Sequence, residues 1–258
     1  MARRVYEEAN IAAIADKIRE KTGGEKTYKA REMPDGVGEV YEAGKKAEYD
    51  AFWDAFQNYG NPKDYSTSFG AAWTKETFRP KHDIITTNAY MLFRGSQMNI
   101  DLAAHLDALG VTLDLSKASN TQYTFNSSKF TRVGVVDFSG SSGTIALDGT
   151  FSYCYNLVTI DKIVLRNEIR VDFGEATFTR CEALENLRFE GKIMHNGLNL
   201  QWSKKLSYDS LMNIINCLED KTNDTSGTTW TVKLGAENIA KLTNEEQDIA
   251  WKKGWNLE

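Results

Sequence analysis

The sequence contains TFNSS at residues 124–128, TFSYC at residues 150–154 and TFTRC at residues 177–181. Each copy is Thr-Phe, two variable residues and a small Ser or Cys, and the three phenylalanines are 26 and 27 residues apart. A run with strand-like apolar spacing follows each copy. These runs are VGVVDF at residues 133–138, VTIDKIVL at residues 158–165 and LENLRF at residues 184–189. The middle of the chain is therefore built from a repeated unit.

A period in this range with one strand per unit is typical of a leucine-rich-repeat-like solenoid. One unit cannot bury its own apolar side chains, so the phenylalanines of successive units are expected to stack. We place the solenoid at residues 91–206, from an imperfect first copy, LFRGS at 92–96, to a degenerate last one, NLQW at 199–202. Short second strands are expected at 144–147 and 169–173, and a helical turn at 101–110.

The segments on either side of the repeats differ from them in pattern. Residues 1–60 have apolar residues at helical spacing and predict helices that attach the protein or oligomerise it. The apolar residues assigned to this role are Ile11, Ile14, Ile18, Val37, Val40, Phe52 and Phe56. Residues 61–90 are too aromatic for a flexible linker and predict a connector that caps the first unit.

Residues 207–258 predict a C-terminal α/β cap. Ser207 or Asp209 can cap a helix, Thr243 and Glu246 form a capping-box pattern, and strands are expected from Trp230 and from Trp255. The predicted fold class is α+β: N-terminal helices, a short leucine-rich-repeat-like β-solenoid and a C-terminal α/β cap.

Composition excludes several functional classes. A net charge of −5 gives no basic excess to neutralise phosphates, so nucleic acid is not an expected partner. The first residues lack the apolar stretch of a signal peptide, and no run is long enough to span a membrane. Cys154 and Cys181 share one repeat position and should stack; they are predicted as small buried side chains, although disulfide geometry would allow them to pair.

Motifs of catalysis or metal binding are absent from the sequence. His82, His105 and His195 are scattered, and no His-x-x-x-His, Cys-x-x-Cys or Gly-x-Ser-x-Gly pattern occurs. SGSSGT at residues 139–144 lacks the Gly-Lys-Ser/Thr ending of a phosphate-binding loop. We therefore expect no catalytic, cofactor-binding or metal-binding residues, and not an enzyme.

Binding is better supported, because a solenoid presents side chains at matched positions of successive units. The candidate surface-binding residues are Tyr153, Tyr155, Arg180 and Glu182, in and just after the variable positions of two copies. The tyrosines form an exposed patch for a sugar or protein surface, or else they pack along the unit with only their hydroxyls in water.

The sequence also resembles known families. The repeats, together with KLG at 233–235, AKLT at 240–243 and KGW at 253–255, resemble BspA-like leucine-rich-repeat proteins of Firmicutes. IADKIREKTG at 14–23, EMP at 32–34, EYDAFWDAFQ at 48–57 and FRPK at 78–81 resemble segments of bacteriophage and prophage tail-associated proteins. These resemblances imply a non-enzymatic structural or adhesive part of a phage tail.

The expected function is that of a tail fibre or baseplate protein, placed in the virion and assembled in the host cytoplasm. Its partners would be other tail proteins, a bacterial surface glycan or protein, and copies of itself, with a homotrimer favoured by analogy. The first alternative is a bacterial cell-surface or secreted leucine-rich-repeat adhesin. The second, a glycan-acting enzyme, has no residues to support it.

Overall fold

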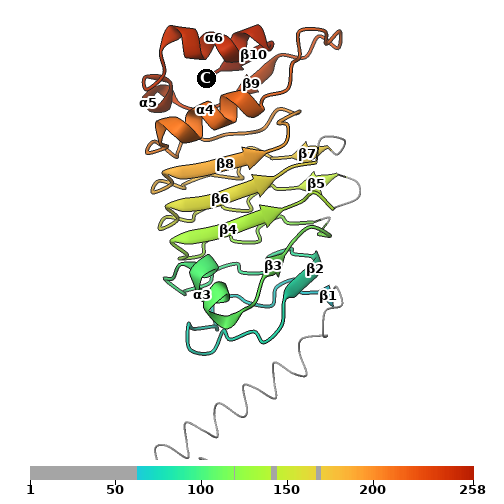
Figure 1. Ribbon diagram of the computed structural model, residues 1–258, viewed down its shortest axis with the longest axis vertical. Helices are drawn as coiled ribbons and strands as arrows, with labels where there is room; N and C mark the ends of the chain where they lie inside the picture. The colour runs from blue at the N-terminus through green and yellow to red at the C-terminus, as the bar shows by residue number, and fades with distance from the viewer. Residues whose placement is uncertain (1–62, 119, 141–143, 167–169) are drawn as a thin grey trace, which may run out of the picture. The chain divides into compact units, whose positions relative to one another are not determined.

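The computed structural model describes residues 63–118, 120–140, 144–166 and 170–258 (Figure 1). The predicted helices of residues 1–60, and with them the attachment residues from Ile11 to Phe56, lie outside this part of the chain. The described part mixes helices and strands.

Three long strands, one from each repeated unit, form a parallel sheet. They are β4 (Arg132–Asp137), β6 (Thr159–Val164) and β8 (Asn186–Glu190), in the order β4-β6-β8. Two short strands, β5 (Ile145–Ala146) and β7 (Val171–Asp172), pair in parallel with each other. The strand predicted after each copy of the pattern, and the second short strand of two units, are confirmed. Each unit thus lies beside the next one along the chain.

Further strands lie before and after these units. β1 (Lys63–Asp64), β2 (Ile84–Asn88) and β3 (Leu113–Asp114) form a parallel sheet in the order β1-β2-β3. β9 (Trp230–Val232) and β10 (Trp255–Leu257) form a parallel pair. The strands predicted from Trp230 and Trp255 are confirmed.

The core is a column of phenylalanine rings. Neighbouring rings along the stack of Phe93, Phe125, Phe151 and Phe178 lie 5.6, 5.3 and 5.4 Å apart, and their planes differ by only 6–8°. Phe69 adds a tilted ring 5.4 Å from Phe93. All five side chains are fully buried. The predicted stacking of Phe on Phe is confirmed.

The other recurring positions of the pattern are also internal. Thr124, Thr150 and Thr177 are fully buried, and each hydroxyl donates to a backbone carbonyl of the preceding unit at 2.7–3.0 Å. Cys154 and Cys181 are buried free thiols that donate to the carbonyls of Phe125 and Phe151 at 2.9 and 3.0 Å. Because a buried polar group is costly without a partner, these side chains join adjacent units by hydrogen bonds.

Two copies of the turn differ from the pattern in sequence but keep its backbone hydrogen bonds. Residues 65–70, within the predicted connector, form a turn like the others: Phe69 donates its amide to Leu92, as Phe93 does to Thr124. The degenerate copy predicted at 199–202 has Leu200 in the place of the phenylalanine. Ser203 donates its amide to the Leu200 carbonyl, as Cys154 does to that of Phe151.

Four helices complete the described part: α3 (Leu102–Leu109), α4 (Tyr208–Cys217), α5 (Ala236–Ile239) and α6 (Asn244–Lys252). α3 packs beside β4 and α4 beside β8, so a helix covers each edge of the three-stranded sheet (Figure 1). The helical turn predicted at 101–110, the helix capped by Ser207 and the capping box of Thr243 and Glu246 are confirmed.

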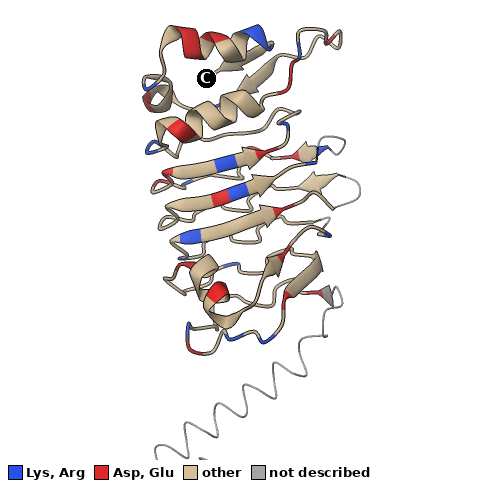
Figure 2. Ribbon diagram, viewed as in Figure 1, with Lys and Arg blue, Asp and Glu red and all other residues tan. Residues whose placement is uncertain are grey.

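Charged residues lie along the three-stranded sheet (Figure 2), and several of them form ion pairs with one another. Arg132 makes two hydrogen bonds to Asp161, at 2.6 and 2.7 Å, and a third to Asp101 at 3.2 Å, and these contacts raise the pKa of its guanidinium. Lys162 pairs with Glu190 at 2.5 Å. These contacts pair Arg132 and Lys162 with acidic side chains, whereas Arg188 of β8 is exposed on the same face outside these pairs.

Candidate binding face

The candidate face is formed by the turn that follows each phenylalanine. The residue two positions after the phenylalanine has a left-handed backbone in four units. These residues are Gly95, Ser127, Tyr153 and Arg180, with φ of 71°, 57°, 61° and 61°. A left-handed backbone at a residue other than glycine costs free energy and persists only where the surrounding structure imposes it.

Hydrogen bonds between units impose this conformation. The amides of Gly95, Ser127 and Tyr153 each donate to a carbonyl of the next unit, at 2.8, 2.8 and 2.7 Å. The side chains at this position therefore form a row with one member per unit. We call the following residues the binding face: Gly95, Ser127, Tyr153 and Arg180 of this row, together with Lys129, Tyr155, Asn156, Glu182 and Trp202.

Tyr153 and Tyr155 stand out on this face. Their side chains are 45% and 53% exposed, and their ring centroids lie 6.2 Å apart in an edge-to-face arrangement. Of the two arrangements that the sequence allowed, an exposed patch and rings packed along the unit, the exposed patch is observed. Large aromatic side chains in water are a common mark of binding surfaces.

Arg180 and Glu182 occupy the matching positions of the next unit. Arg180 forms a 3.0 Å ion pair with Glu182, and its guanidinium lies 4.1 Å from the centre of the Trp202 ring. Trp202 comes two residues after Leu200, the position that Tyr153 and Arg180 hold in their units. Sequence reasoning missed Trp202 as a member of the face, although its place in the degenerate copy was a usable signal.

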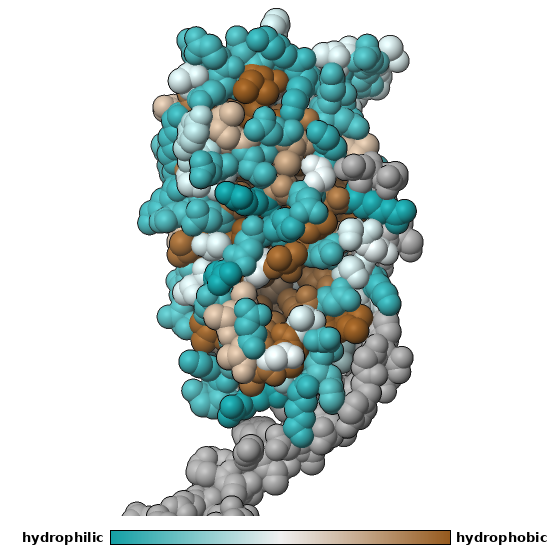
Figure 3. Space-filling model, viewed as in Figure 1, coloured by the Kyte–Doolittle hydropathy of each residue, from teal (hydrophilic) through white to brown (hydrophobic). Residues whose placement is uncertain are grey.

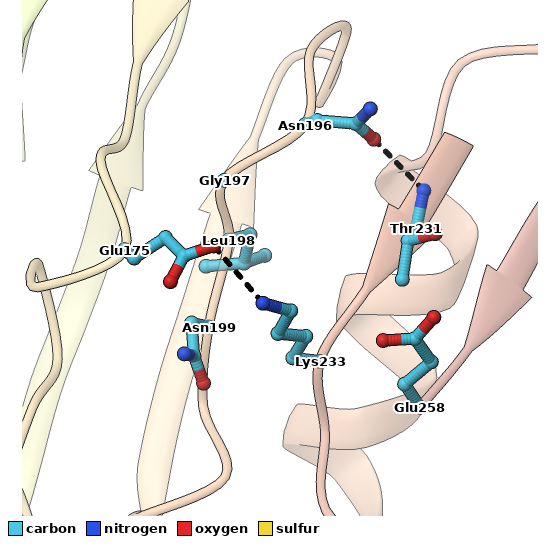
Figure 4. A pocket seen from close by; sticks show the side chains of 8 residues that line it. All are labelled: Glu175, Asn196, Gly197, Leu198, Asn199, Thr231, Lys233 and Glu258. Atoms are coloured by element: carbon cyan, nitrogen blue, oxygen red, sulfur yellow. Dashed lines mark hydrogen bonds and ion pairs between the residues drawn. The ribbon is translucent and has the colours of Figure 1, made fainter. Parts of the chain in front are cut away.

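A small polar pocket lies elsewhere, among residues from β9 and the segments beside it (Figure 4). Its volume is about 230 Å³. Lys233 pairs with Glu175 at 3.0 Å, and the Asn196 side chain accepts from the Thr231 amide at 2.8 Å. The polar groups that line it thus largely bind one another. The lining residues are Glu175, Asn196, Gly197, Leu198, Asn199, Thr231, Lys233 and Glu258.

A hollow of about 310 Å³ lies where α3, β3 and β4 meet (Figure 3), and its lining is partly apolar and partly charged, with Asp107, Arg132 and Asp161 among its residues. Leu102 and Leu106 of α3 form one wall, and Val133 and Val135 of β4 form another. Val135 is 49% exposed there. The hollow exists because a helix takes the place beside β4 that a strand takes beside β6.

The buried thiols of Cys154 and Cys181 have the properties of structural residues. Burial raises the pKa of the Cys154 thiol to about 11 and that of Cys181 well above its ordinary value, so both are protonated near neutral pH and are weak nucleophiles. Among the described residues, no three His, Cys, Asp or Glu side chains come together as metal ligands would. Within the same residues, no helix is long and apolar enough to cross a membrane.

No family model, curated protein or solved structure matches the chain.

Proposed function

We propose that the protein is a structural and adhesive component of a bacteriophage tail, either a tail fibre or a baseplate protein. Its repeated units are a leucine-rich-repeat-like solenoid that ends in an α/β cap. Parallel pairing between successive units, a shared column of phenylalanine rings and helices over both sheet edges support this architecture. The role itself comes from the resemblance of the chain to tail-associated and repeat proteins.

One observation carries the adhesive part of the proposal. Tyr153 and Arg180 stand at the same left-handed position of adjacent units, where Gly95 stands in an earlier unit. Glycine would adopt this backbone without cost, so the large side chains at these positions are accommodated at a small cost in stability. Exposed side chains placed in this way are candidates for recognition of a surface.

In this proposal the two parts of the chain have different tasks. Residues 1–60 attach the protein to other tail proteins or assemble it into a homo-oligomer, a trimer by analogy with the threefold symmetry common in tail fibres. The binding face contacts the bacterial surface or a neighbouring fibre. The protein acts by binding and not by catalysis.

Labelling of phage particles tests the role. Antibodies against the protein, coupled to gold, should mark the tail end of purified particles in electron micrographs. Antibodies against a capsid protein serve as the control for position. If the antibodies instead mark bacteria from cultures that contain no particles, the protein is a cell-surface adhesin and the tail proposal fails.

A further inference from the structure

A hollow of about 250 Å³ lies beside Tyr153 and Tyr155 on the binding face. Its remaining lining comes from Ser127, Ser128, Lys129 and Asn156. Aromatic rings and hydrogen-bonding side chains therefore meet in one place. Such a combination suits a sugar, because the C–H face of a sugar ring packs against an aromatic ring while its hydroxyls need polar partners.

The charged residue that lines the hollow indicates which kind of sugar it would bind. Lys129 is its only charged lining residue, no carboxylate lines it, and among the described residues Lys129 forms no ion pair. The nearby carboxylate of Glu182 is paired with Arg180. An ammonium group with no acidic partner beside it attracts an anionic group of a ligand.

The units beside the hollow allow for a ligand longer than one sugar. Ser127 lies on the unit before Tyr153, Arg180 on the unit after it, and Trp202 on the unit after that. The units repeat every 5.3–5.6 Å along the phenylalanine column. This repeat resembles the length of one sugar in an extended polysaccharide. Sugars of one chain could then meet successive units of the row.

We propose that the hollow beside Tyr153 and Tyr155 binds an acidic sugar of a surface polysaccharide, with the sugar ring on the tyrosines and its carboxylate or phosphate group at Lys129. The proposal rests on the proposed adhesive function and names its ligand class. The shared chemistry is an anionic group on a sugar ring.

Binding of the full-length protein to immobilised polysaccharides tests this proposal. The probes are polygalacturonate, which carries a carboxylate on each sugar, its fully methyl-esterified form, which has the same backbone without the charge, and a phosphomannan. The protein should bind polygalacturonate or the phosphomannan, and the ester should bind more weakly. The two acidic probes tell a carboxylate ligand from a phosphate ligand.

Three variants locate the site. Tyr153→Gly removes one ring and fits the left-handed backbone, and Tyr155→Ala removes the other; each should weaken binding about tenfold, as loss of an aromatic anchor does. Lys129→Gln should weaken binding about fivefold at low salt and less at high salt, because exposed charges are screened. Trp251→Ala and Lys117→Gln, which change an exposed aromatic residue and an exposed lysine elsewhere, are the controls and should leave binding unchanged.

Three results would overturn the proposal. They are no binding to either acidic probe, binding of the methyl ester as strong as a measurable binding of polygalacturonate, and full binding by the three variants. Circular dichroism of each variant confirms that it is folded. Because gold labelling of particles does not depend on any ligand, the protein can prove to be a tail component while this proposal fails, and the two outcomes are distinguishable.

Discussion

Phe151 lies between the rings of Phe125 and Phe178 and is fully buried. Phe151→Ala removes the middle ring of the column and leaves a cavity that the stacked units on both sides cannot fill. We expect the free energy of unfolding to fall by about 3–5 kcal/mol, measured by urea denaturation. Phe151→Leu is the matched control, because Leu200 fills the equivalent place, and it should cost less. A change near zero for Phe151→Ala would contradict the packing of the column.

Cys154 gives a prediction about pH. Its ordinary thiol pKa of 9.0 is raised by burial to about 11, so the folded state holds this proton more tightly than the unfolded state. Its contribution to stability is complete below pH 9 and is lost as the pH rises towards 11. Over this window the wild type should lose up to about 1.4 kcal/mol per pH unit relative to Cys154→Ser. Denaturation curves recorded from pH 7 to 11 measure the difference.

Cys154→Ser is a conservative change, because Ser128 stands at the same position of the preceding unit. The variant should therefore fold normally and differ from the wild type mainly in its alkaline limb. If the stability of the two proteins changes with pH in the same way over this range, the Cys154 thiol has the same pKa in the folded and unfolded states, and the prediction is wrong.

Equal spacing in the sequence was enough to predict that the phenylalanine and the small Ser or Cys of the repeat are internal. Phe151 and Cys154 recur at the same place, and each needs the same contact with a neighbouring unit, whereas the burial of Thr150 was not predicted. The left-handed backbone of Tyr153 could not be predicted, because it depends on a hydrogen bond to Thr179 in another unit and tyrosine does not favour it.

One member of the column, Phe69, was missed for a different reason. It is preceded by Ser and followed three residues later by Ala, and even the degenerate copy that was predicted has Leu200 in the place of the phenylalanine. The stack requires an apolar side chain of suitable size at this position. It does not require the surrounding letters of the pattern, so a motif search underestimates the number of units.

At the scale of elements, side chains of α4 form the hydrogen bonds to the edge of β8 that a neighbouring strand would otherwise form. The Asn213 amide group accepts from the backbone amide of Phe189 at 2.7 Å and donates to its carbonyl at 3.2 Å. Ser210 accepts from the Leu187 amide at 3.0 Å. These contacts satisfy backbone groups at the edge of β8 that another strand would otherwise pair.

Asn213→Ala should therefore lower the free energy of unfolding by more than is usual for a partly buried helix residue. It leaves the amide and the carbonyl of Phe189 without these partners, and we expect a loss of about 1–3 kcal/mol in the free energy of unfolding. Asn216→Ala, the same change at an exposed position of α4, is the matched control and should change stability by less than about 0.5 kcal/mol. Thermal and urea denaturation of both variants provide the comparison, and equal losses in the two variants would mean that contact with the edge of β8 does not explain the effect, because alanine has a higher helix propensity than asparagine.

The ends of helices were predictable because their signals are local. Asp101, Ser207 and Thr243 each precede a helix and accept a backbone amide with their side chains. That α3 and α4 would lie beside β4 and β8 was not predictable from these caps. Which element covers a sheet edge depends on contacts between segments far apart in the sequence.

At the scale of the whole molecule, recognition and stability fall to different positions of the same unit. Thr150, Phe151 and Cys154 face inward and join the units, while Tyr153 and Tyr155 face water. Substitutions at the outward positions can change a ligand without disturbing the column. A protein built in this way could change its target while keeping its fold, which suits the proposed adhesive role.

The proposed attachment role of residues 1–60 gives the last prediction. If apolar residues such as Ile14 and Phe52 hold copies of the chain together, the full-length protein should be a homo-oligomer, with a trimer expected, by light scattering coupled to size-exclusion chromatography. Ile14→Glu and Phe52→Glu should lower the mass towards that of one chain, because a buried charge without a partner is costly. Lys129→Gln, a change within the repeats, should leave the mass unchanged. A wild-type protein that runs as a monomer at all concentrations would contradict oligomerisation by these residues and leave attachment to other tail proteins as their proposed task.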